Sequence, residues 1–198
     1  MKSLKLYIFL LVVVSFAMTA FIPAGKIKRH SSRRIPIDKT ILHLTTSDSI
    51  DNPYSIIVYK NTYELKVFDD QGWYATYPVV FGSKDLGDKM REGDKRTPDG
   101  NFKVILKKIN PDWGPELLLD YPNPAAYEKF NERKAKGLLP KGAKIGGGIA
   151  IHATRPKEEW TVDYYYNWTD GCISVKYTEM QDLYSYIPVG TPVTIVEQ

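Results

Sequence analysis

Apolar and polar residues alternate in the first part of the chain after residue 53, and this pattern predicts β-strands. In the segment 63–68, Tyr63, Leu65 and Val67 fall on one face, while Glu64 and Lys66 fall on the other. The segment 54–59 is also rich in β-branched and aromatic residues. Only residues 60–62 separate the two segments, so we expect them to form a hairpin.

Further apolar runs predict more strands and two short helices. The expected strands cover residues 77–81, 101–109, 117–121, 144–152 and 191–196. One helix is expected over residues 125–136, stopped by Gly137, and a second over residues 177–187. Residues 82–100 are polar and end in a strong turn signal, so they form a long loop. Several short strands with two short helices indicate a mainly β fold, either a sandwich or a partial barrel.

The N-terminal segment has the pattern of an export signal. Two lysines precede an unbroken apolar run, and small residues follow it. We therefore expect residues 1–22 to be a signal peptide or an N-terminal membrane anchor, and residues 23–53 to be a basic and polar linker arm. The remaining part, 54–198, is expected to be one folded domain. Such a protein would lie in the periplasm or cell envelope, and only its N-terminus would contact the membrane.

Composition excludes several classes of protein. The hydrophobic fraction of 43% is too high for a disordered chain, and the net charge of +4 is too small to predict a nucleic-acid groove. The chain has one cysteine, Cys172, so no disulfide can form within it. A zinc site needs three or four ligands, and Cys172 with His152 falls short of that.

Cys172 and His152 lie in one glycine-rich and aromatic stretch, residues 146–173. A cysteine becomes a nucleophile when a base or cation favours its thiolate, and His152 is the histidine closest to it in sequence. The alternative is that Cys172 is a small buried hydrophobic residue and His152 a satisfied core residue. The aromatic residues between them either line a cleft or cover the sheet; they are Trp160, Tyr164, Tyr165, Tyr166 and Trp168.

Several short blocks give these two residues a family context. In chain order the blocks are VVFG (79–82), GDKRTPDG (93–100), LLLDYPNP (117–124), GGGIAIH (146–152), TDGCI (169–173) and GTPVTI (190–195). Together they resemble the L,D-transpeptidase catalytic domain of the YkuD type over residues 54–196. The Trp-Thr-x-Gly-Cys form at residues 168–172 is similar to a variant branch of that family.

The resemblance implies roles for individual residues. Cys172 would be the nucleophile, His152 the general base, the Ala153 carbonyl the group that orients His152, and the Gly171 N–H an oxyanion donor. The residues expected to bind substrate are Arg155, Tyr165, Trp168, Thr169, Asp170 and Ser174.

Two positions depart from the family pattern. Asp170 stands where the family usually has histidine, and Ser174 where it usually has arginine. A carboxylate close to the thiol would raise the pKa of the thiol and oppose its activation. Arg155 is a candidate for the missing cation.

The resemblance also implies a reaction. A transpeptidase of this family acts on peptidoglycan stem peptides through a thioester on Cys172. It either makes 3→3 cross-links or attaches a wall-associated protein, and it needs no cofactor and no metal. Two alternatives stay open: a hydrolase of the same fold, in which water resolves the thioester, and a non-catalytic domain that binds the wall.

Overall fold

The computed structural model describes residues 52–198. The expected signal or anchor at residues 1–22, and nearly all of the expected linker arm at 23–53, lie outside the described residues. None of the described helices is long and apolar enough to cross a membrane.

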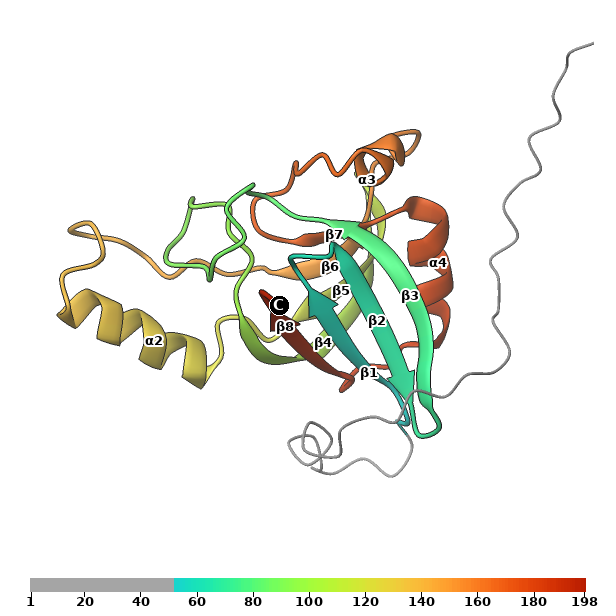
Figure 1. Ribbon diagram of the computed structural model, residues 1–198, viewed down its shortest axis with the longest axis horizontal. Coiled ribbons are helices and arrows are strands. Elements are labelled where there is room, and N and C mark those ends of the chain that lie inside the picture. Colours follow the sequence, from blue (N-terminus) through green and yellow to red (C-terminus); the bar gives the residue numbers. More distant parts are fainter. Residues whose placement is uncertain (1–51) are drawn as a thin grey trace, which may run out of the picture. The chain divides into compact units, whose positions relative to one another are not determined.

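Eight strands of the described part form a closed β-barrel (Figure 1). They are β1 (Ser55–Tyr59), β2 (Glu64–Asp69), β3 (Gly72–Val80), β4 (Gly100–Asn110), β5 (Gly114–Leu119), β6 (Ala150–Ala153), β7 (Ile173–Val175) and β8 (Pro192–Val196). Around the barrel their order is β1-β2-β3-β7-β6-β5-β4-β8. The mainly β class predicted from the sequence is therefore confirmed, and the sheet closes completely.

The predicted hairpin of β1 and β2 is confirmed. The two strands pair antiparallel, and Val58 lies opposite Leu65. Both side chains are fully buried in the core, as alternation predicts for one face of each strand. Burying an aliphatic side chain of this size contributes about 1.5–3 kcal/mol relative to leaving it exposed.

The strands β6 and β7 lie side by side and parallel, and they carry the stretch around His152 and Cys172. Ile151 of β6 lies opposite Ile173 of β7, and both point into the core. The expected strand at residues 144–152 is shorter than predicted, because β6 begins only at Ala150. Gly146 and Gly148 have φ of 79° and 72°, a left-handed conformation that interrupts a strand and that glycine adopts without strain. The strand β7 is not predicted by the hydrophobic pattern of the sequence.

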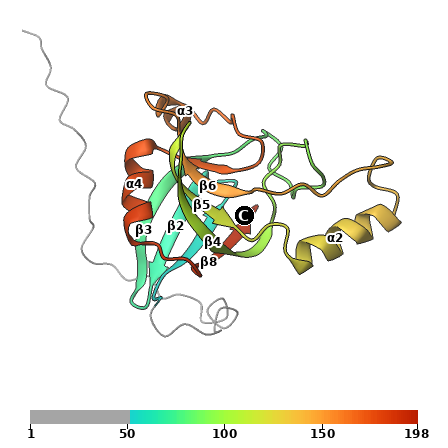
Figure 2. The ribbon, with the colours of Figure 1, turned by 180° about the vertical axis from the view of Figure 1, so that it is seen from behind.

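Three helices accompany the barrel in the described part. They are α2 (Pro124–Ala135), α3 (Trp160–Asp163) and α4 (Tyr177–Tyr186). The Asn123 side chain caps α2 by accepting a hydrogen bond of 3.0 Å from the Ala126 N–H, and Gly137 follows the helix with a φ of 70°. The short helix α3 was not predicted. Seen from either side, α2 and α4 lie at opposite ends of the barrel (Figures 1 and 2).

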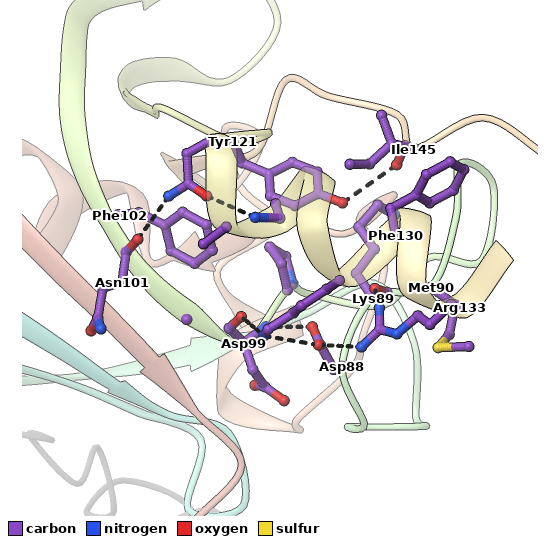
Figure 3. A pocket seen from close by; sticks show the side chains of 16 residues that line it. Asp88, Lys89, Met90, Asp99, Asn101, Phe102, Tyr121, Phe130, Arg133 and Ile145 are labelled. Atoms are coloured by element: carbon purple, nitrogen blue, oxygen red, sulfur yellow. Dashed lines mark hydrogen bonds and ion pairs between the residues drawn. The ribbon is translucent and has the colours of Figure 1, made fainter. Parts of the chain in front are cut away.

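Charged residues attach α2 to the loop that precedes β4 (Figure 3). Asp88 of the loop contacts Arg133 Nη2 at 2.6 Å and Lys129 Nζ at 3.1 Å, both on α2, and it accepts a hydrogen bond of 2.8 Å from the Asp99 N–H. Burial acts to raise the pKa of Asp88, but these hydrogen bonds and the charge of Lys129 outweigh it and lower the pKa. The cavity beside this cluster has a volume of about 40 Å³, enough for a few water molecules but not for a peptide.

Candidate active site

A row of three polar side chains crosses the strands β5, β6 and β7. Glu116 of β5 lies directly opposite His152 of β6, and His152 lies opposite Ser174 of β7. Cys172 precedes Ser174 by two residues, so it lies on the same face of the sheet as His152, one strand away. The sheet register therefore brings the predicted nucleophile and the predicted base to the same face.

His152 is held as a neutral imidazole with one free nitrogen. Its Nδ1 lies 2.7 Å from the carbonyl oxygen of Ala153, and a carbonyl oxygen can only accept, so Nδ1 carries the proton. Burial lowers the pKa of His152, against the hydrogen bond to Ala153 and the charge of Glu116, which act to raise it. The ring is therefore neutral near pH 7, and its Nε2 is left with a lone pair that accepts a proton.

Cys172 is held as a thiol in the resting site. Burial raises the pKa of Cys172 to about 11, and the charges of Glu116 and Asp170 act in the same direction. A backbone hydrogen bond from Ala150 and the charge of Lys89 oppose this rise. The side chain is half-buried, and its Sγ donates to the Gly148 carbonyl at 3.5 Å. The pair thus rests as a neutral thiol and a neutral imidazole, which suits proton transfer at the moment of attack.

Two tryptophans enclose the imidazole. The Trp113 ring lies 5.1 Å from the His152 ring, and the Trp168 ring lies 5.4 Å away in an edge-on arrangement. His152 itself is only 3% exposed. Because two aromatic rings pack against the imidazole, its orientation is fixed by packing as well as by the bond to Ala153.

The turn before Cys172 is stabilised by two threonines. The Thr169 hydroxyl accepts from the Gly171 N–H at 3.2 Å and donates to the Cys172 carbonyl at 2.8 Å. The Thr97 hydroxyl donates to the Gly171 carbonyl at 2.9 Å. The N–H of Gly171, expected to bind the oxyanion, therefore already has a partner within the turn.

The other residues predicted to bind substrate differ in accessibility. The Asp170 side chain is 91% exposed and lies 3.5 Å from Lys95 Nζ. Arg155 lies 5.1 Å from the centre of the Trp168 ring and 3.7 Å from Glu158, and it is not among the main charges acting on the thiol. Tyr165 is exposed and packs edge-on against Tyr63.

Ser174 does not fit its predicted role. Its side chain has no exposed surface, so a substrate cannot reach it from solvent in this structure. The reason is its place in β7, directly beside His152 in the sheet.

Sequence reasoning did not find Glu116, Trp113, Thr97 or Lys89. The first two had a signal in the sequence. Glu116 is a single carboxylate within an otherwise apolar strand, and Trp113 precedes it in the turn between β4 and β5. A carboxylate in a buried strand requires hydrogen-bonding partners. That requirement makes Glu116 a candidate site residue that can be recognised from the sequence.

The described residues contain no group of three or more His, Cys, Asp or Glu side chains placed to hold a metal ion.

Comparison with known proteins identifies the family of the chain. The L,D-transpeptidase catalytic domain family (YkuD) matches residues 53–195, so the chain belongs to that family. YqjB of Bacillus subtilis (strain 168), which carries the name of an L,D-transpeptidase, is 30% identical over 150 residues, covering 74% of this chain and 72% of YqjB.

Two solved structures share the fold. Bd1075 of Bdellovibrio bacteriovorus is 25% identical with a TM-score of 0.52, and the match covers 74% of this chain and 49% of Bd1075. Pgp2 of Campylobacter jejuni, described as a helical cell shape determining protein, is 24% identical with a TM-score of 0.56; the match covers 75% of this chain and 49% of Pgp2. The chain thus spans about half the length of either solved chain.

Proposed function

We propose that the protein is a cysteine-dependent L,D-transpeptidase that acts on peptidoglycan stem peptides. The observation that carries this proposal is the state of His152, a neutral imidazole whose Nδ1 is fixed on Ala153 and whose Nε2 is free. Cys172 immediately precedes the neighbouring strand β7, whose Ser174 lies opposite His152. Family membership supplies the substrate class.

The first step forms a thioester. His152 Nε2 takes the proton of the Cys172 thiol as the sulfur attacks the carbonyl carbon of the third stem residue. The carbon–nitrogen bond to the fourth residue then breaks. The imidazolium returns its proton to the departing amine, which leaves as D-alanine.

The oxyanion of this step needs a backbone donor at the turn. Because the Gly171 N–H is bonded to Thr169, the proposal assigns the donor to the N–H of Cys172. Thr97 holds the carbonyl of the same peptide unit, Gly171–Cys172. In a planar trans peptide the N–H points opposite to the C=O, so this bond also fixes the direction of the donor. Removing one oxyanion donor typically costs about 10²–10³ in rate.

The second step transfers the acyl group. An acceptor amine attacks the thioester, His152 takes its proton, and the sulfur leaves as a thiolate that the imidazolium reprotonates. An amine of a second stem gives a 3→3 cross-link, and an amine of a wall-associated protein attaches that protein. The proposal places the reaction in the periplasm or cell envelope, reached through the signal or anchor expected at residues 1–22.

The aspartate at position 170, where the family usually has histidine, is compatible with activity. Asp170 acts to raise the pKa of the thiol, but burial is the larger cause, and its side chain is almost fully exposed to solvent. Solvent screening reduces the effect of such a charge.

The proposal is tested by incubating the protein with purified tetrapeptide muropeptides and analysing the products by mass spectrometry. Cross-linked dimers support transfer. Tripeptides without dimers would assign a hydrolase of the same fold, and unchanged substrate would leave only the non-catalytic, wall-binding function.

Cys172→Ala should abolish product formation in the same assay, and activity that survives it would contradict the assigned nucleophile. A carbapenem should add covalently to Cys172 in the wild-type protein and not in the variant. Intact mass spectrometry measures this adduct directly.

A further inference from the structure

Glu116 is a buried carboxylate in the same row as His152. It is 4% exposed, and its oxygens meet only donors. Oε1 lies 3.2 Å from Lys108 Nζ, while Oε2 accepts from Asn110 Nδ2 at 3.3 Å and from Trp113 Nε1 at 3.1 Å. An environment of three donors suits the ionised carboxylate, which accepts at both oxygens and donates from neither.

Trp113 connects this carboxylate to the imidazole. Its indole N–H is bound to Glu116, and its ring lies 5.1 Å from the His152 ring. Glu116 also lies directly opposite His152 in the antiparallel pair of β5 and β6. Side chains at opposite positions of such a pair have Cβ atoms about 4.5–5.5 Å apart.

We propose that Glu116 is a positioning residue for the acyl transfer: it holds Trp113 against His152, and its charge stabilises the imidazolium that forms when His152 takes the thiol proton. This inference rests on the proposed function for its chemistry, although its geometry does not. The carboxylate makes no hydrogen bond to the imidazole, because Nδ1 is bound to Ala153. The charge of Glu116 acts on the imidazolium through space, and its hydrogen bond to Trp113 holds that ring against His152.

The charge of Glu116 has two opposite effects on the reacting pair. It favours the imidazolium of His152 and disfavours the thiolate of Cys172. Glu116 is the direct neighbour of His152, whereas Cys172 belongs to the segment leading into β7, one strand further away. The stabilisation of the imidazolium is therefore larger than the destabilisation of the thiolate. As a result, the charge of Glu116 favours proton transfer from the thiol to the imidazole.

The other charged groups near Cys172 and His152 do not reverse this difference between the two effects of Glu116. Lys108 reduces the field of Glu116 but is 45% exposed at its side chain, so solvent screens it. Arg155 lies over the Trp168 ring and beside Glu158, and it is not among the main charges acting on His152. Lys89 and Asp170 act on the thiol with opposite signs.

The decisive variant is Glu116→Gln. Glutamine keeps an acceptor for the Trp113 N–H but removes the charge, so a purely structural role would leave the titration of His152 unchanged. We expect the pKa of His152, measured by NMR of the ring in the full protein, to fall. With muropeptide substrate we expect kcat to fall about tenfold at unchanged KM, and the acidic limb of kcat/KM to move to lower pH. An unchanged His152 pKa would overturn the proposal.

Two companion variants keep the test decisive if Glu116→Gln does not fold. Lys108→Met removes the partner cation and keeps the carboxylate, so the pKa of His152 should rise instead of fall. Trp113→Phe keeps a ring beside His152 and removes the indole N–H, and it should lower kcat with a smaller change in that pKa. A shift of the same sign in Lys108→Met and Glu116→Gln would overturn the proposal.

Alkylation by iodoacetamide separates this inference from the proposed function, since it needs no peptidoglycan. If Glu116 acts mainly through His152, Glu116→Gln should slow alkylation of Cys172 at pH 8. If it acts mainly on the thiol, the variant should react faster, and the inference is wrong. Slower alkylation and a lower His152 pKa in a protein that turns over no muropeptide would support the electrostatic role of Glu116 and reject the proposed function.

Discussion

The hydroxyl of Thr97, at the end of the loop 82–100, donates a hydrogen bond of 2.9 Å to the carbonyl oxygen of Gly171. These residues are 74 positions apart in the chain, and Thr97 is buried. The bond connects the segment 97–100 (TPDG), which leads into β4, to the peptide unit that ends at Cys172. A part of the chain that the sequence marks only as a turn thus helps to fix the geometry of the nucleophile.

Replacing Thr97 tests this connection. Thr97→Val keeps the shape and removes the hydroxyl, which leaves the Gly171 carbonyl without its donor and the peptide unit free to rotate. We expect kcat for muropeptides to fall about tenfold or more with little change in KM, because an oxyanion donor acts in the transition state. Thr97→Ser restores the hydroxyl and should recover most of the activity. Equal loss in both variants would contradict the role of the hydrogen bond.

The close packing of Gly82 against the backbone near Cys172 leads to a second prediction. A Cβ on Gly82 would lie 2.4 Å from the Lys95 carbonyl oxygen, 2.5 Å from that of Thr169 and 2.6 Å from the Gly171 nitrogen. These are backbone atoms and cannot yield easily. Gly82→Ala should therefore destabilise the protein by about 2 kcal/mol or more and reduce alkylation of Cys172.

Gly147→Ala is the matched control for Gly82→Ala. A Cβ there meets Pro122 Cδ at 3.5 Å, an ordinary contact, so the variant should unfold close to the wild-type midpoint in urea. A similar loss of stability in both variants would show that the packing around Gly82 is not the cause.

The barrel strands could be predicted well because their signals are local. Leu65 alternates with polar neighbours, Val58 lies in a run rich in β-branched residues, and a short connection separates the two segments, so local signals predict the hairpin. The strand β7 was missed because it has only three residues, Ile173–Val175, all buried. Such a segment shows no alternation, and only the partner strands β3 and β6 make it a strand.

The site could be predicted only in part, for a related reason. Cys172 and His152 were identifiable because the family blocks surround them. Glu116 and Thr97 were not, because their contacts with the site span a strand pairing and a loop 74 residues away. The burial of Ser174 depends in the same way on the sheet register, which a residue type does not reveal.

The ionic cluster at Asp88 gives a stability prediction. Its lowered pKa means that the ionised form stabilises the folded protein above the ordinary aspartate pKa, and that this contribution is lost as pH falls through the lowered value. Asp88→Asn should destabilise the protein at pH 7 by about 1–3 kcal/mol, and the difference from wild type should shrink in acid. Urea unfolding at pH 7 and pH 3 measures both.

Glu132→Gln serves as the control for Asp88→Asn. It removes an exposed partner of Lys136 on the same helix and should leave the unfolding midpoint unchanged. Attachment of α2 can be followed separately, since hydrogen exchange in residues 124–135 should accelerate in Asp88→Asn and not in Glu132→Gln. Unaltered exchange in Asp88→Asn would show that the cluster does not hold the helix.

Glu179 on α4 gives a prediction of the opposite sign. Burial raises its pKa to about 7, with the charges of Glu159, Asp163 and Asp182 adding to the rise and Lys176 opposing it. Its Oε2 is buried and, within residues 52–198, has no hydrogen-bond partner. A raised carboxyl pKa contributes stability below the ordinary glutamate value, and this contribution is lost as pH rises through about 7.

The uncharged variant Glu179→Gln should not lose stability as the pH rises through about 7, because it has no carboxyl group to ionise at this position. Its stability relative to wild type should increase between pH 5 and pH 8.5, by about 1–2 kcal/mol after allowance for partial exposure. Urea unfolding at the two pH values measures the difference, and Glu128→Gln, an exposed glutamate on α2, should show no such trend. A wild-type stability advantage that grows with pH would mean that Glu179 is ionised and stabilising in the folded protein, contrary to its burial beside three other carboxylates.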